Sequence, residues 1–511
     1  MVVKSRLPSP AVVDRPLGVL LREKLAPFAD RTALVDGPSG RSYTYRQLLD
    51  LSASIANALV ARGVTKGDRI AFVTPNVPEV ALAYHGVILA GGVAMMLNPL
   101  STVDELTKYF AVGKPRIVVT VGLFTDTIRM AASDVDLVVL DEDSFRALLG
   151  HGTEPPDIDI GPDDLAVMPY SSGTTGFPKG VMLTHRNLVA QTAGLSAMPD
   201  AVVIPGANVL AVLPFFHIYG IVAFLTYGLM QGATIIAIPR FDFVQFLDLA
   251  RRHEVPLLHV VPPILLGLAK FPAPLDLPHL KAALVGAAPL SAELAREFTA
   301  KSGAEVFQVY GMTEVSGGTH LGSLAPGRNQ PGSIGELIAG VEARVVSTGT
   351  GEDVDPSTPG EIWVRSDVVM RGYFENDEAT ARTIDAEGWL HTGDIGYVDA
   401  NGNWYLVDRV KELIKYKGLQ VAPAELEAVL LQHEAVADAA VYPFPDEEAG
   451  EIPKAAVVLR AGITVPPEAL MSFVAERVAP QKRVRALAFV DQIPKSASGK
   501  ILRRVLIDGD R

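Results

Sequence analysis

Short runs of aliphatic and β-branched residues alternate with amphipathic helical patterns along most of the chain. Each run is bounded by turn or helix sequence, which is typical of a buried strand followed by a covering helix. The alternation predicts an α/β fold with helix-covered parallel sheets, and the length favours two such sheets in succession. The predicted strands are Arg69–Val73, Arg116–Val121, Leu137–Leu140, Val209–Leu213, Thr234–Ile238, Leu257–Val261 and Ala282–Val285.

One helix is indicated by residues at both of its ends. Thr44 and Gln47 have the spacing of a capping box, in which two side chains satisfy backbone groups at a helix start. Gly63 suits the C-terminal end of the same helix. Apolar residues recur at helical spacing between these signals, at Leu48, Leu51, Ile55 and Leu59. The pattern predicts a helix between the two signals.

The pattern changes between Gly335 and Tyr405. Short strands such as Glu361–Arg365 and Trp404–Val407 alternate there with glycine, aspartate and proline turns. This texture predicts a small β-rich subdomain. A lysine-dense segment follows Arg409, and a compact α+β region then runs to the end, so we expect a domain boundary near 409–411.

Composition excludes several classes of protein. The 511 residues are 49% hydrophobic and 20% charged, which favours two or more folded domains over disorder. The net charge of −13 disfavours a nucleic-acid surface, and the lack of cysteine excludes disulfides, cysteine nucleophiles and thiolate metal sites. Met1–Pro16 lacks the apolar core of a secretory signal. We expect a cytoplasmic protein.

A long uncharged segment tests that expectation. Val209–Pro239 contains no Asp, Glu, Lys or Arg, and its length would suit a membrane span. Pro214, Gly220, Gly228 and Gly232 interrupt it, however, and His217 lies within it. The segment is better interpreted as strand, loop, helix and strand inside an α/β core, so we expect no integral membrane segment.

A glycine-rich stretch, Tyr170–Gly180, carries the strongest chemical signal. It lies between the predicted strand Leu165–Tyr170 and a helix start at Thr184, and it contains several hydroxyl side chains and Lys179. Backbone N–H groups of such a turn can converge on a polyphosphate. It is not a Walker A loop, because Pro178 stands where that motif needs other residues. A plain flexible loop is the alternative.

Five further segments have both a chemical and a plain structural interpretation. Gln308–Glu314 offers an aromatic face, a hydroxyl and a hard oxygen ligand for Mg²⁺, or it is only a strand end. The carboxylate of Asp394 could accept ribose hydroxyls or form a turn. Pro214–Gly220 contains His217, which could be merely packed. Lys411–Gly418 could be a solvated basic stretch, and Lys495–Lys500 could be a flexible terminal loop.

Together and in this order, these segments resemble the adenylate-forming superfamily of acyl-CoA synthetases, luciferases and peptide-synthetase adenylation domains. The block 408–427 is most similar to the 4-coumarate–CoA ligase group. The resemblance implies an N-terminal adenylation core, residues 1–409, of two stacked helix-covered sheets plus a small β-rich subdomain. It also implies a small mobile α+β C-terminal lid, residues 410–511, and a site between the two.

The resemblance also implies the reaction. A carboxylate attacks the α-phosphate of ATP, pyrophosphate leaves, and coenzyme A then attacks the acyl-adenylate. Lys500 would bridge the two anions as catalytic lysine, Thr313 would hold the α-phosphate, His217 would gate the acyl pocket, and Glu314 would bind Mg²⁺. The implied ATP- and AMP-binding residues are Ser171, Ser172, Gly173, Thr174, Thr175, Lys179, Ala287, Gln308, Tyr310, Gly311, Thr313, Asp394, Arg409, Gln420 and Lys500.

Two other sets follow from the same resemblance. The implied acyl pocket consists of His217, Tyr219, Ala223, Gly286, Ala287, Val309, Gly317 and Leu321. The implied face for coenzyme A and thioester formation consists of Arg240, Lys415, Lys417 and Gly418, with Lys411 as the hinge. A swinging lid would exclude water during adenylation and then admit coenzyme A.

The acyl pocket departs from the plant 4-coumarate ligases. Val309 replaces a glycine and narrows the pocket, whereas Gly317 and Gly318 replace a bulkier Pro-Val pair and open it elsewhere. The sequence therefore predicts an ATP-dependent acid–CoA ligase for an aryl, cinnamyl-like or medium-chain acid, without fixing the acid.

Three alternatives stay open. The activated acid could pass to a carrier protein or an amine instead of coenzyme A. A luciferase-type oxygenase is disfavoured because the C-terminus Asp508–Arg511 lacks the peroxisomal Ser-Lys-Leu signal. A non-catalytic nucleotide-binding regulator would be expected to lose Lys500 or Glu314, and both are present. The expected partners are the small carboxylic acid, ATP and coenzyme A, with a monomeric or homodimeric protein and no nucleic acid.

Overall fold

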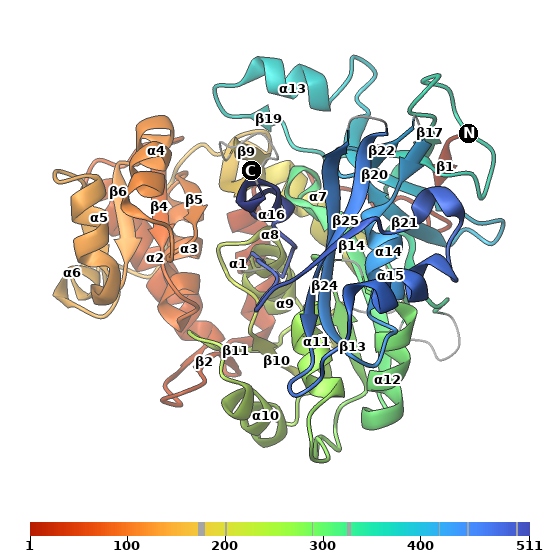
Figure 1. The fold of residues 1–511 in the computed structure, drawn as a ribbon. Helices are drawn as coiled ribbons and strands as arrows, with labels where there is room; N and C mark the ends of the chain where they lie inside the picture. The colour runs from red at the N-terminus through yellow and green to blue at the C-terminus, as the bar shows by residue number, and fades with distance from the viewer. Residues whose placement is uncertain are drawn as a thin grey trace.

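The structure is a computed structural model, shown in Figure 1. It describes residues 1–171, 179–199, 202–288, 290–323, 329–417, 419–446, 449–496 and 499–510, with Leu419, Gln420 and Gln481 described by their backbone alone. The α/β fold class predicted from the alternating pattern is confirmed, with a large N-terminal domain and a small C-terminal domain.

A mostly parallel sheet forms the first layer of the large domain. Its strands lie in the order β19 (Gly372–Tyr373), β9 (Lys179–Thr184), β8 (Leu165–Ser171), β5 (Val93–Leu97), β4 (Arg69–Val73), β6 (Ile117–Thr120) and β7 (Asp136–Val139). Strands β4 to β8 are parallel, whereas β8 and β9 pair as an antiparallel hairpin around the glycine-rich stretch.

A second, mixed sheet joins the predicted parallel strands to the β-rich subdomain. Its parallel end is β12 (Leu257–Val260), β13 (Ala282–Val285) and β14 (Glu305–Met312). The antiparallel part continues through β15 (Gly317–Leu321), β16 (Ser333–Leu337), β21 (Trp404–Arg409), β20 (Leu390–Val398), β18 (Gly360–Arg365), β17 (Glu342–Val346) and β1 (Val3–Lys4). The β-rich segment is thus an extension of the second sheet. The junction lies at β14 and β15.

A smaller sheet closes the lower part of the domain in Figure 1. Its order is β10 (Asn208–Ala211), β11 (Thr234–Ala237), β2 (Thr32–Asp36) and β3 (Ser42–Thr44). The uncharged segment Val209–Pro239 supplies β10 and β11 together with the short helical turns between them, and most of its side chains are buried. Among the described residues, no helix is long and apolar enough to cross a membrane.

Helices cover these sheets. They are α1 (Leu17–Leu25), α2 (Tyr45–Ala61), α3 (Pro78–Leu89), α4 (Val103–Gly113), α5 (Thr125–Ala131), α6 (Asp143–Arg146), α7 (His185–Ser196), α8 (Ile218–Gly220), α9 (Tyr227–Met230), α10 (Phe243–Arg252), α11 (Pro262–Ala269), α12 (Ala292–Ser302) and α13 (Asp377–Thr383). The segment η3 (Ile221–Thr226) is a π-helix, and the 3₁₀ turns are η1 (Ala26–Phe28), η2 (Gly122–Phe124) and η4 (Thr313–Val315). The predicted capping box is confirmed, because Thr44 and Gln47 bond each other's backbone N–H at the start of α2.

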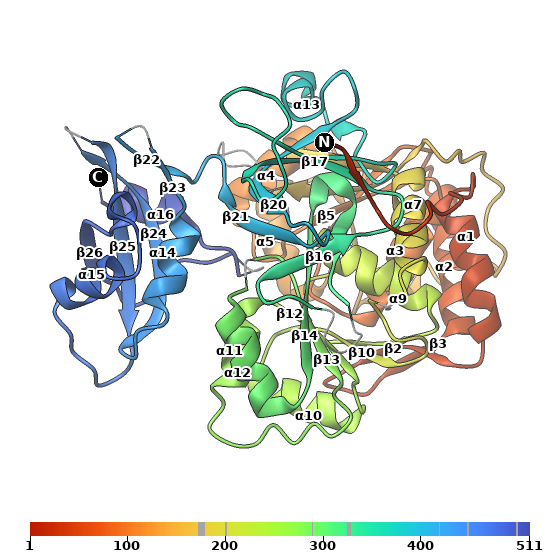
Figure 2. The same cartoon turned by 90° about the vertical axis from the view of Figure 1, so that its right-hand side faces the viewer.

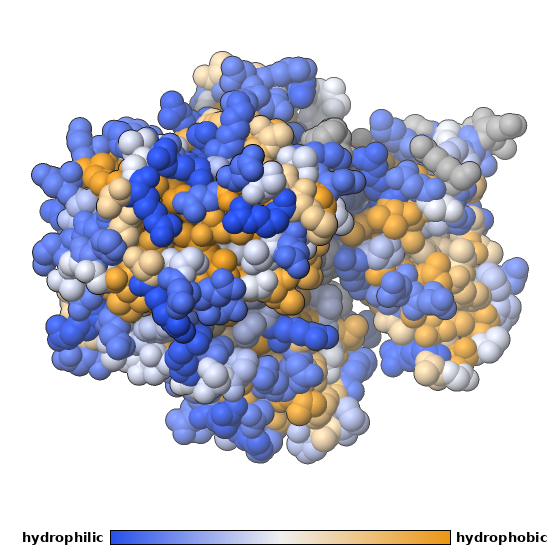
Figure 3. All heavy atoms as spheres, turned by 90° about the vertical axis from the view of Figure 1, so that its left-hand side faces the viewer, coloured by the Kyte–Doolittle hydropathy of each residue, from blue (hydrophilic) through white to orange (hydrophobic). Residues whose placement is uncertain are grey.

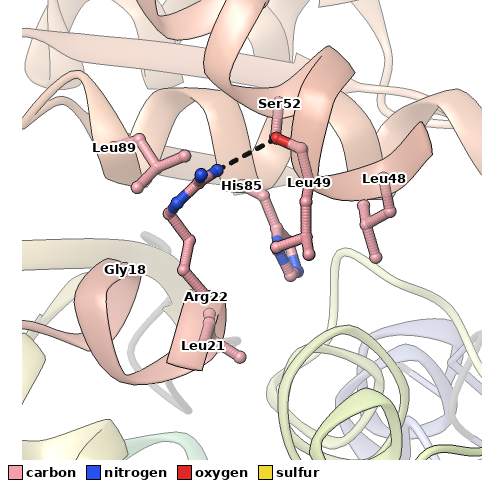
Figure 4. A pocket seen from close by; sticks show the side chains of 8 residues that line it. All are labelled: Gly18, Leu21, Arg22, Leu48, Leu49, Ser52, His85 and Leu89. Carbon is pink, nitrogen blue, oxygen red and sulfur yellow. Dashed lines mark hydrogen bonds between the residues drawn. The ribbon is translucent and has the colours of Figure 1, made fainter. Parts of the chain in front are cut away.

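Helices α1, α2 and α3 pack against one another away from the C-terminal domain. Figure 4 shows the crevice between them, where the Arg22 guanidinium donates to the backbone carbonyl of Leu49 at 3.2 Å. The apolar stem of Arg22 lies among leucine side chains of the same crevice, so the arginine both packs and satisfies a carbonyl.

The C-terminal domain, hereafter the lid, has its own sheet and core. Its strands are β23 (Leu419–Val421), β22 (Ile414–Tyr416), β25 (Gly450–Leu459), β24 (Val436–Asp446) and β26 (Ala486–Phe489). Its helices are α14 (Pro423–Leu430), α15 (Pro467–Ala475), the turn η5 (Pro480–Lys482) and α16 (Arg503–Gly509). Figure 2 shows the lid beside the large domain, and a groove separates the two on the face in Figure 3. The exact boundary at residue 409 stays a prediction.

Candidate active site

Strand β14 divides the candidate site into two sides. Consecutive residues of a strand point to opposite faces of a sheet, so Val309 and Tyr310 face different surroundings. The Tyr310 hydroxyl donates to Asp394 Oδ2 at 2.7 Å. Val309 instead packs against glycine backbone, since a Cβ placed on Gly286 would lie 2.8 Å from its Cγ1. The first side is called the nucleotide side and the second the acyl side.

The nucleotide side is built on paired strands. Asp394 on β20 and Arg409 on β21 are register partners, and Arg409 Nε lies 2.9 Å from Asp394 Oδ1. The Asp394 side chain is only 8% exposed. Burial raises the pKa of this carboxyl, while the Arg409 charge and the Tyr310 hydroxyl act in the opposite direction. A carboxylate held in this way could accept hydrogen bonds from a polyhydroxyl ligand.

A buried carboxylate follows directly after β14. Glu314 lies in the turn η4 next to Thr313, and both are buried. The Tyr373 hydroxyl donates to Glu314 Oε1 at 2.9 Å, and Lys179 Nζ lies 4.5 Å from the centre of the Tyr373 ring. Tyr373 therefore connects the predicted metal ligand to the lysine near the end of the glycine-rich stretch.

The surroundings of Glu314 suit Mg²⁺. Among the described residues, no group of three or more His, Cys, Asp or Glu side chains could hold a metal ion. Mg²⁺ is commonly held by one or two carboxylates together with substrate phosphates, so one buried carboxylate near Lys179 of the predicted phosphate-binding stretch fits this ion. Burial and the nearby Lys411 charge lower the pKa of Lys179, and Glu314 acts to raise it.

The acyl side is apolar and aromatic. His217 Nδ1 accepts from the Tyr219 backbone N–H at 3.3 Å, and the Tyr219 hydroxyl lies 2.9 Å from Nδ1 of His259. Leu321 is buried opposite Val309 on β15, and Ala223 is buried in η3. The structure thus brings Tyr219, Gly286, Val309, Gly317 and Leu321 together around the end of β14, with His217 in contact with Tyr219.

The backbone of this region shows one close approach between strands and one strained residue. A Cβ on Gly311 would lie 1.8 Å from the carbonyl oxygen of Gly317, so β14 and β15 approach as closely as they do only because residue 311 is glycine. Ala287 has φ of 69°, in the left-handed region that alanine rarely adopts. Strained residues of this kind are concentrated at ligand sites.

The lid brings a lysine to the nucleotide side. Lys500 is partly buried, and its electrostatic neighbours include Arg409, Glu412 and Asp394. Burial lowers the pKa of Lys500, and the Arg409 charge adds to this effect. Its backbone is held by Ser496, whose Oγ accepts from the Lys500 N–H at 3.1 Å. The lysine predicted to be catalytic therefore lies close to Asp394 and Arg409, across the predicted domain boundary.

A buried charge network supports this part of the lid. Arg503 forms ion pairs with Glu412 and with Glu427, and its Nε donates to the backbone carbonyl of Val441 at 2.8 Å. Arg503 and Glu427 side chains are each 11% exposed. The network fixes α16, and with it the chain that follows Lys500, to the lid sheet.

Other predicted residues lie elsewhere or outside the described part. The amide of Gln308 donates to the backbone carbonyl of Ser333 at 2.8 Å, so it contacts β16. Lys415 and Lys417 are exposed at β22, Lys411 is exposed before it, and Arg240 is exposed after β11. Ser171 ends β8. The residues that lie outside the description are Ser172, Gly173, Thr174, Thr175 and Gly418, and Gln420 is described by its backbone only.

Three residues of the site escaped the sequence interpretation. Tyr373, His259 and Gln191 each contact a predicted site residue or the strand β15 beside it. None lies in a segment that received a chemical interpretation from the sequence, so no motif marks them. The signal is purely spatial, because His259 follows Tyr219 by 40 positions and Tyr373 follows Glu314 by 59.

The chain is similar to known proteins over almost its whole length. Residues 21–374 match the model of the AMP-binding enzyme family, and residues 425–500 match that of the AMP-binding enzyme C-terminal domain. The chain is 40% identical to 4-coumarate–CoA ligase 1 of Solanum tuberosum, over 99% of this chain and 96% of that protein.

Solved structures show the same architecture. ATP-bound MatB from Rhodopseudomonas palustris superposes with a TM-score of 0.90 at 30% identity, covering 97% of this chain and 99% of that one. A benzoate CoA ligase from Burkholderia xenovorans LB400 gives a TM-score of 0.87 at 27% identity, covering 96% and 100%. The chain belongs to the AMP-binding enzyme family of adenylate-forming proteins. Within that family it is an ATP-dependent, AMP-forming acid–CoA ligase.

Proposed function

We propose that this ligase activates an aryl, cinnamyl-like or medium-chain monocarboxylic acid and transfers it to coenzyme A. One observation carries the proposal: a single strand, β14, has a charged nucleotide side at Tyr310 and an uncharged, aromatic acyl side at Val309. The acid would occupy the acyl side with its carboxylate directed to the junction. The names of the plant relatives, which act on 4-coumarate, support an aromatic substrate.

In the first half-reaction the carboxylate would attack the α-phosphate of ATP. Asp394 and Arg409 would hold the ribose, and Thr313 would hold the α-phosphate. Lys500 would lie between the carboxylate and the phosphate, where a fixed cation lowers their repulsion as charge builds up in the transition state. Glu314 would hold Mg²⁺, which when bound neutralises charge on the phosphates. Tyr373 would keep Glu314 oriented.

In the second half-reaction coenzyme A would attack the acyl-adenylate. We propose that the lid, residues 410–511, turns about Lys411 and offers the face that carries Lys415, Lys417 and Gly418. Arg240 would attract the phosphates of coenzyme A. A lid that closes differently for the two steps would protect the adenylate from water and then admit the thiol.

The test is an acid panel with two readouts. Pyrophosphate release is measured with each acid and ATP, with and without coenzyme A, and acyl-CoA is detected by mass spectrometry. We expect aryl or cinnamyl acids to give both products, with no acyl-CoA when ATP is omitted. Pyrophosphate release without acyl-CoA would favour a carrier protein or an amine as acceptor. Failure of every acid to release pyrophosphate would overturn the proposal.

A further inference from the structure

A buried histidine lies behind the acyl side. His259 is on β12, and the alternation of that strand turns it to the same face as Leu257, which packs in the main core. Its side chain is 1% exposed, and Nδ1 lies 2.9 Å from the Tyr219 hydroxyl. Its Nε2 has no hydrogen-bond partner among the described residues. An unpartnered buried polar atom is costly, and a bound ligand can remove that cost.

The histidine is linked to the residues predicted to enclose the acyl group. A Cβ on Gly286 would lie 3.3 Å from Cε2 of Tyr219 and 2.8 Å from Cγ1 of Val309. The Tyr219 ring therefore fills the space between Val309 and His259. The rings of Tyr219, His259 and Phe224 also pack edge to face or tilted against one another.

A second unpartnered polar atom lies on the other side of Val309. Gln191 on α7 donates from Nε2 to the carbonyl of Gly318 at 2.9 Å, while its Oε1 is buried without a partner among the described residues. A Cβ on Gly318 would lie 2.9 Å from Cγ2 of Val309. Polar atoms with unused hydrogen-bonding capacity thus flank the valine on both sides.

The described residues exert no charge effect on the three titratable groups of this region. Burial alone lowers the pKa of His217 to about 4 and that of His259 to about 3, and burial alone raises the pKa of Tyr219. No charged residue contributes to any of these three shifts. A second carboxylate on the substrate would be taken out of water here without a cation to compensate it, which is strongly unfavourable.

We propose that the His259–Tyr219 pair selects acids that carry a neutral hydrogen-bonding substituent, such as a ring hydroxyl, and rejects acids with a second charge. The His259–Tyr219 pair can bind a substituent that donates a hydrogen bond or one that accepts it, depending on the tautomer of His259. If Tyr219 donates to Nδ1, Nε2–H is a donor; if Nδ1–H donates to Tyr219, Nε2 is an acceptor and the phenol is the donor. Gln191 Oε1 offers a further acceptor. This proposal rests on the proposed acid–CoA ligase function.

The experiment compares acids that differ only in one substituent. The probes are cinnamic acids with a hydroxyl or a methyl group at the same ring position, tested at each position, because the two groups are similar in size. ATP–pyrophosphate exchange gives kcat/KM for each acid. We expect the intact protein to prefer the hydroxyl acid at one position, and His259→Leu to reduce that hydroxyl-to-methyl ratio by about tenfold, the size of one neutral hydrogen bond.

A milder variant guards against loss of folding. Tyr219→Phe removes one oxygen and keeps the ring, and it should reduce the same hydroxyl-to-methyl ratio. Tyr227→Phe, a buried tyrosine on α9, is the matched control and should leave the ratio unchanged. A carboxylate at the preferred position should lower kcat/KM at least 100-fold in the intact protein.

The outcomes separate the two proposals. If some acids support exchange and acyl-CoA formation but neither variant changes the hydroxyl-to-methyl ratio, the His259 proposal is wrong and the ligase proposal stands. Equal use of the carboxylate-substituted acid would also contradict it. If no acid supports exchange, both proposals are overturned.

Discussion

The two sides of β14 differ in how their polar groups are paired. On the nucleotide side the buried carboxylates have partners: Asp394 pairs with Arg409, and Glu314 accepts from the Tyr373 hydroxyl. On the acyl side Tyr219 and His259 are neutral, contact each other, and leave capacity unused. A side whose carboxylates are held by fixed partners is suited to binding ATP, which is the same for every acid, whereas a neutral side with unused hydrogen-bonding capacity is suited to selecting the acid. Because side chains alternate between the two faces of β14, Tyr310 on the nucleotide side and Val309 on the acyl side are consecutive residues.

The strongest test of this division is Lys500→Ala. Loss of one preorganised cation should lower adenylation by roughly 10²–10³ for every acid alike. Formation of the thioester from preformed acyl-adenylate should be largely spared. Single-turnover assays of the two half-reactions measure this, with Lys495→Ala as control, since Lys495 is in the same loop but pairs with Asp438 at 2.6 Å. An equal loss in both half-reactions would remove Lys500 from the proposed role.

The next effect is expected from Asp394→Asn. Asp394 accepts from Tyr310 and Arg409, and hydrogen bonds to charged groups are each worth about 1.5–3 kcal/mol. We expect KM for ATP to rise about 10- to 100-fold, with the ranking of acids unchanged. Asp399→Asn is the control, because Asp399 only holds a turn in the same sheet. A changed ranking of acids would mean that the two sides are not independent.

In contrast to Asp394→Asn, the substitution Val309→Gly should change the order in which the enzyme prefers different acids. Removing the isopropyl group opens the acyl side. The kcat/KM for bulkier ring-substituted acids, relative to that for smaller acids, should therefore rise roughly fivefold, which corresponds to about 1 kcal/mol in activation free energy. Val306→Gly carries the same cost of a glycine in β14 but faces a different core cluster, and should leave the ranking as it is. An unchanged ranking in Val309→Gly would show that Val309 does not line the acid site.

The smallest expected effect is a shift with pH. Burial lowers the pKa of Lys500 below the usual 10.5 of lysine, so its charge is lost at a lower pH than that of an exposed lysine. Adenylation should therefore decline with rising pH in a limb centred below 10.5. Lys500→Arg, which stays protonated, should lose that limb even if its rate is lower. The measurement is the pH profile of ATP–pyrophosphate exchange for both proteins. If Lys500→Arg keeps the same decline at high pH, a group other than Lys500 causes that decline.

Local patterns predicted much of the fold. Strand β4 was predicted at its exact residues, and the capping box of α2 formed as expected, because both depend on neighbours in sequence. The order of strands could not be predicted in this way. Asp394 and Arg409 become partners only because β20 and β21 pair, and the β-rich segment extends the second sheet only because β15 follows β14.

The site shows the same limit. Tyr310, Glu314 and Asp394 were identified because they lie in recognisable segments, and the structure brings Tyr310 and Asp394 into contact. His259 and Tyr373 lie in ordinary strands, and they become relevant only through contacts over 40 and 59 positions. Residues that act by supporting another side chain need carry no pattern of their own.

The short strand β19 has a consequence for how the chain can be divided. Gly372 and Tyr373 come after β18 of the second sheet, yet they pair with Val181 and Met182 at the edge of the first sheet. A fragment that ends before Gly372 would leave β9 as an open edge with unpaired backbone groups, which favours aggregation. A cut before Gly372 would also remove β20 and β21 from the middle of the second sheet, so one cut would damage both sheets and should give insoluble material.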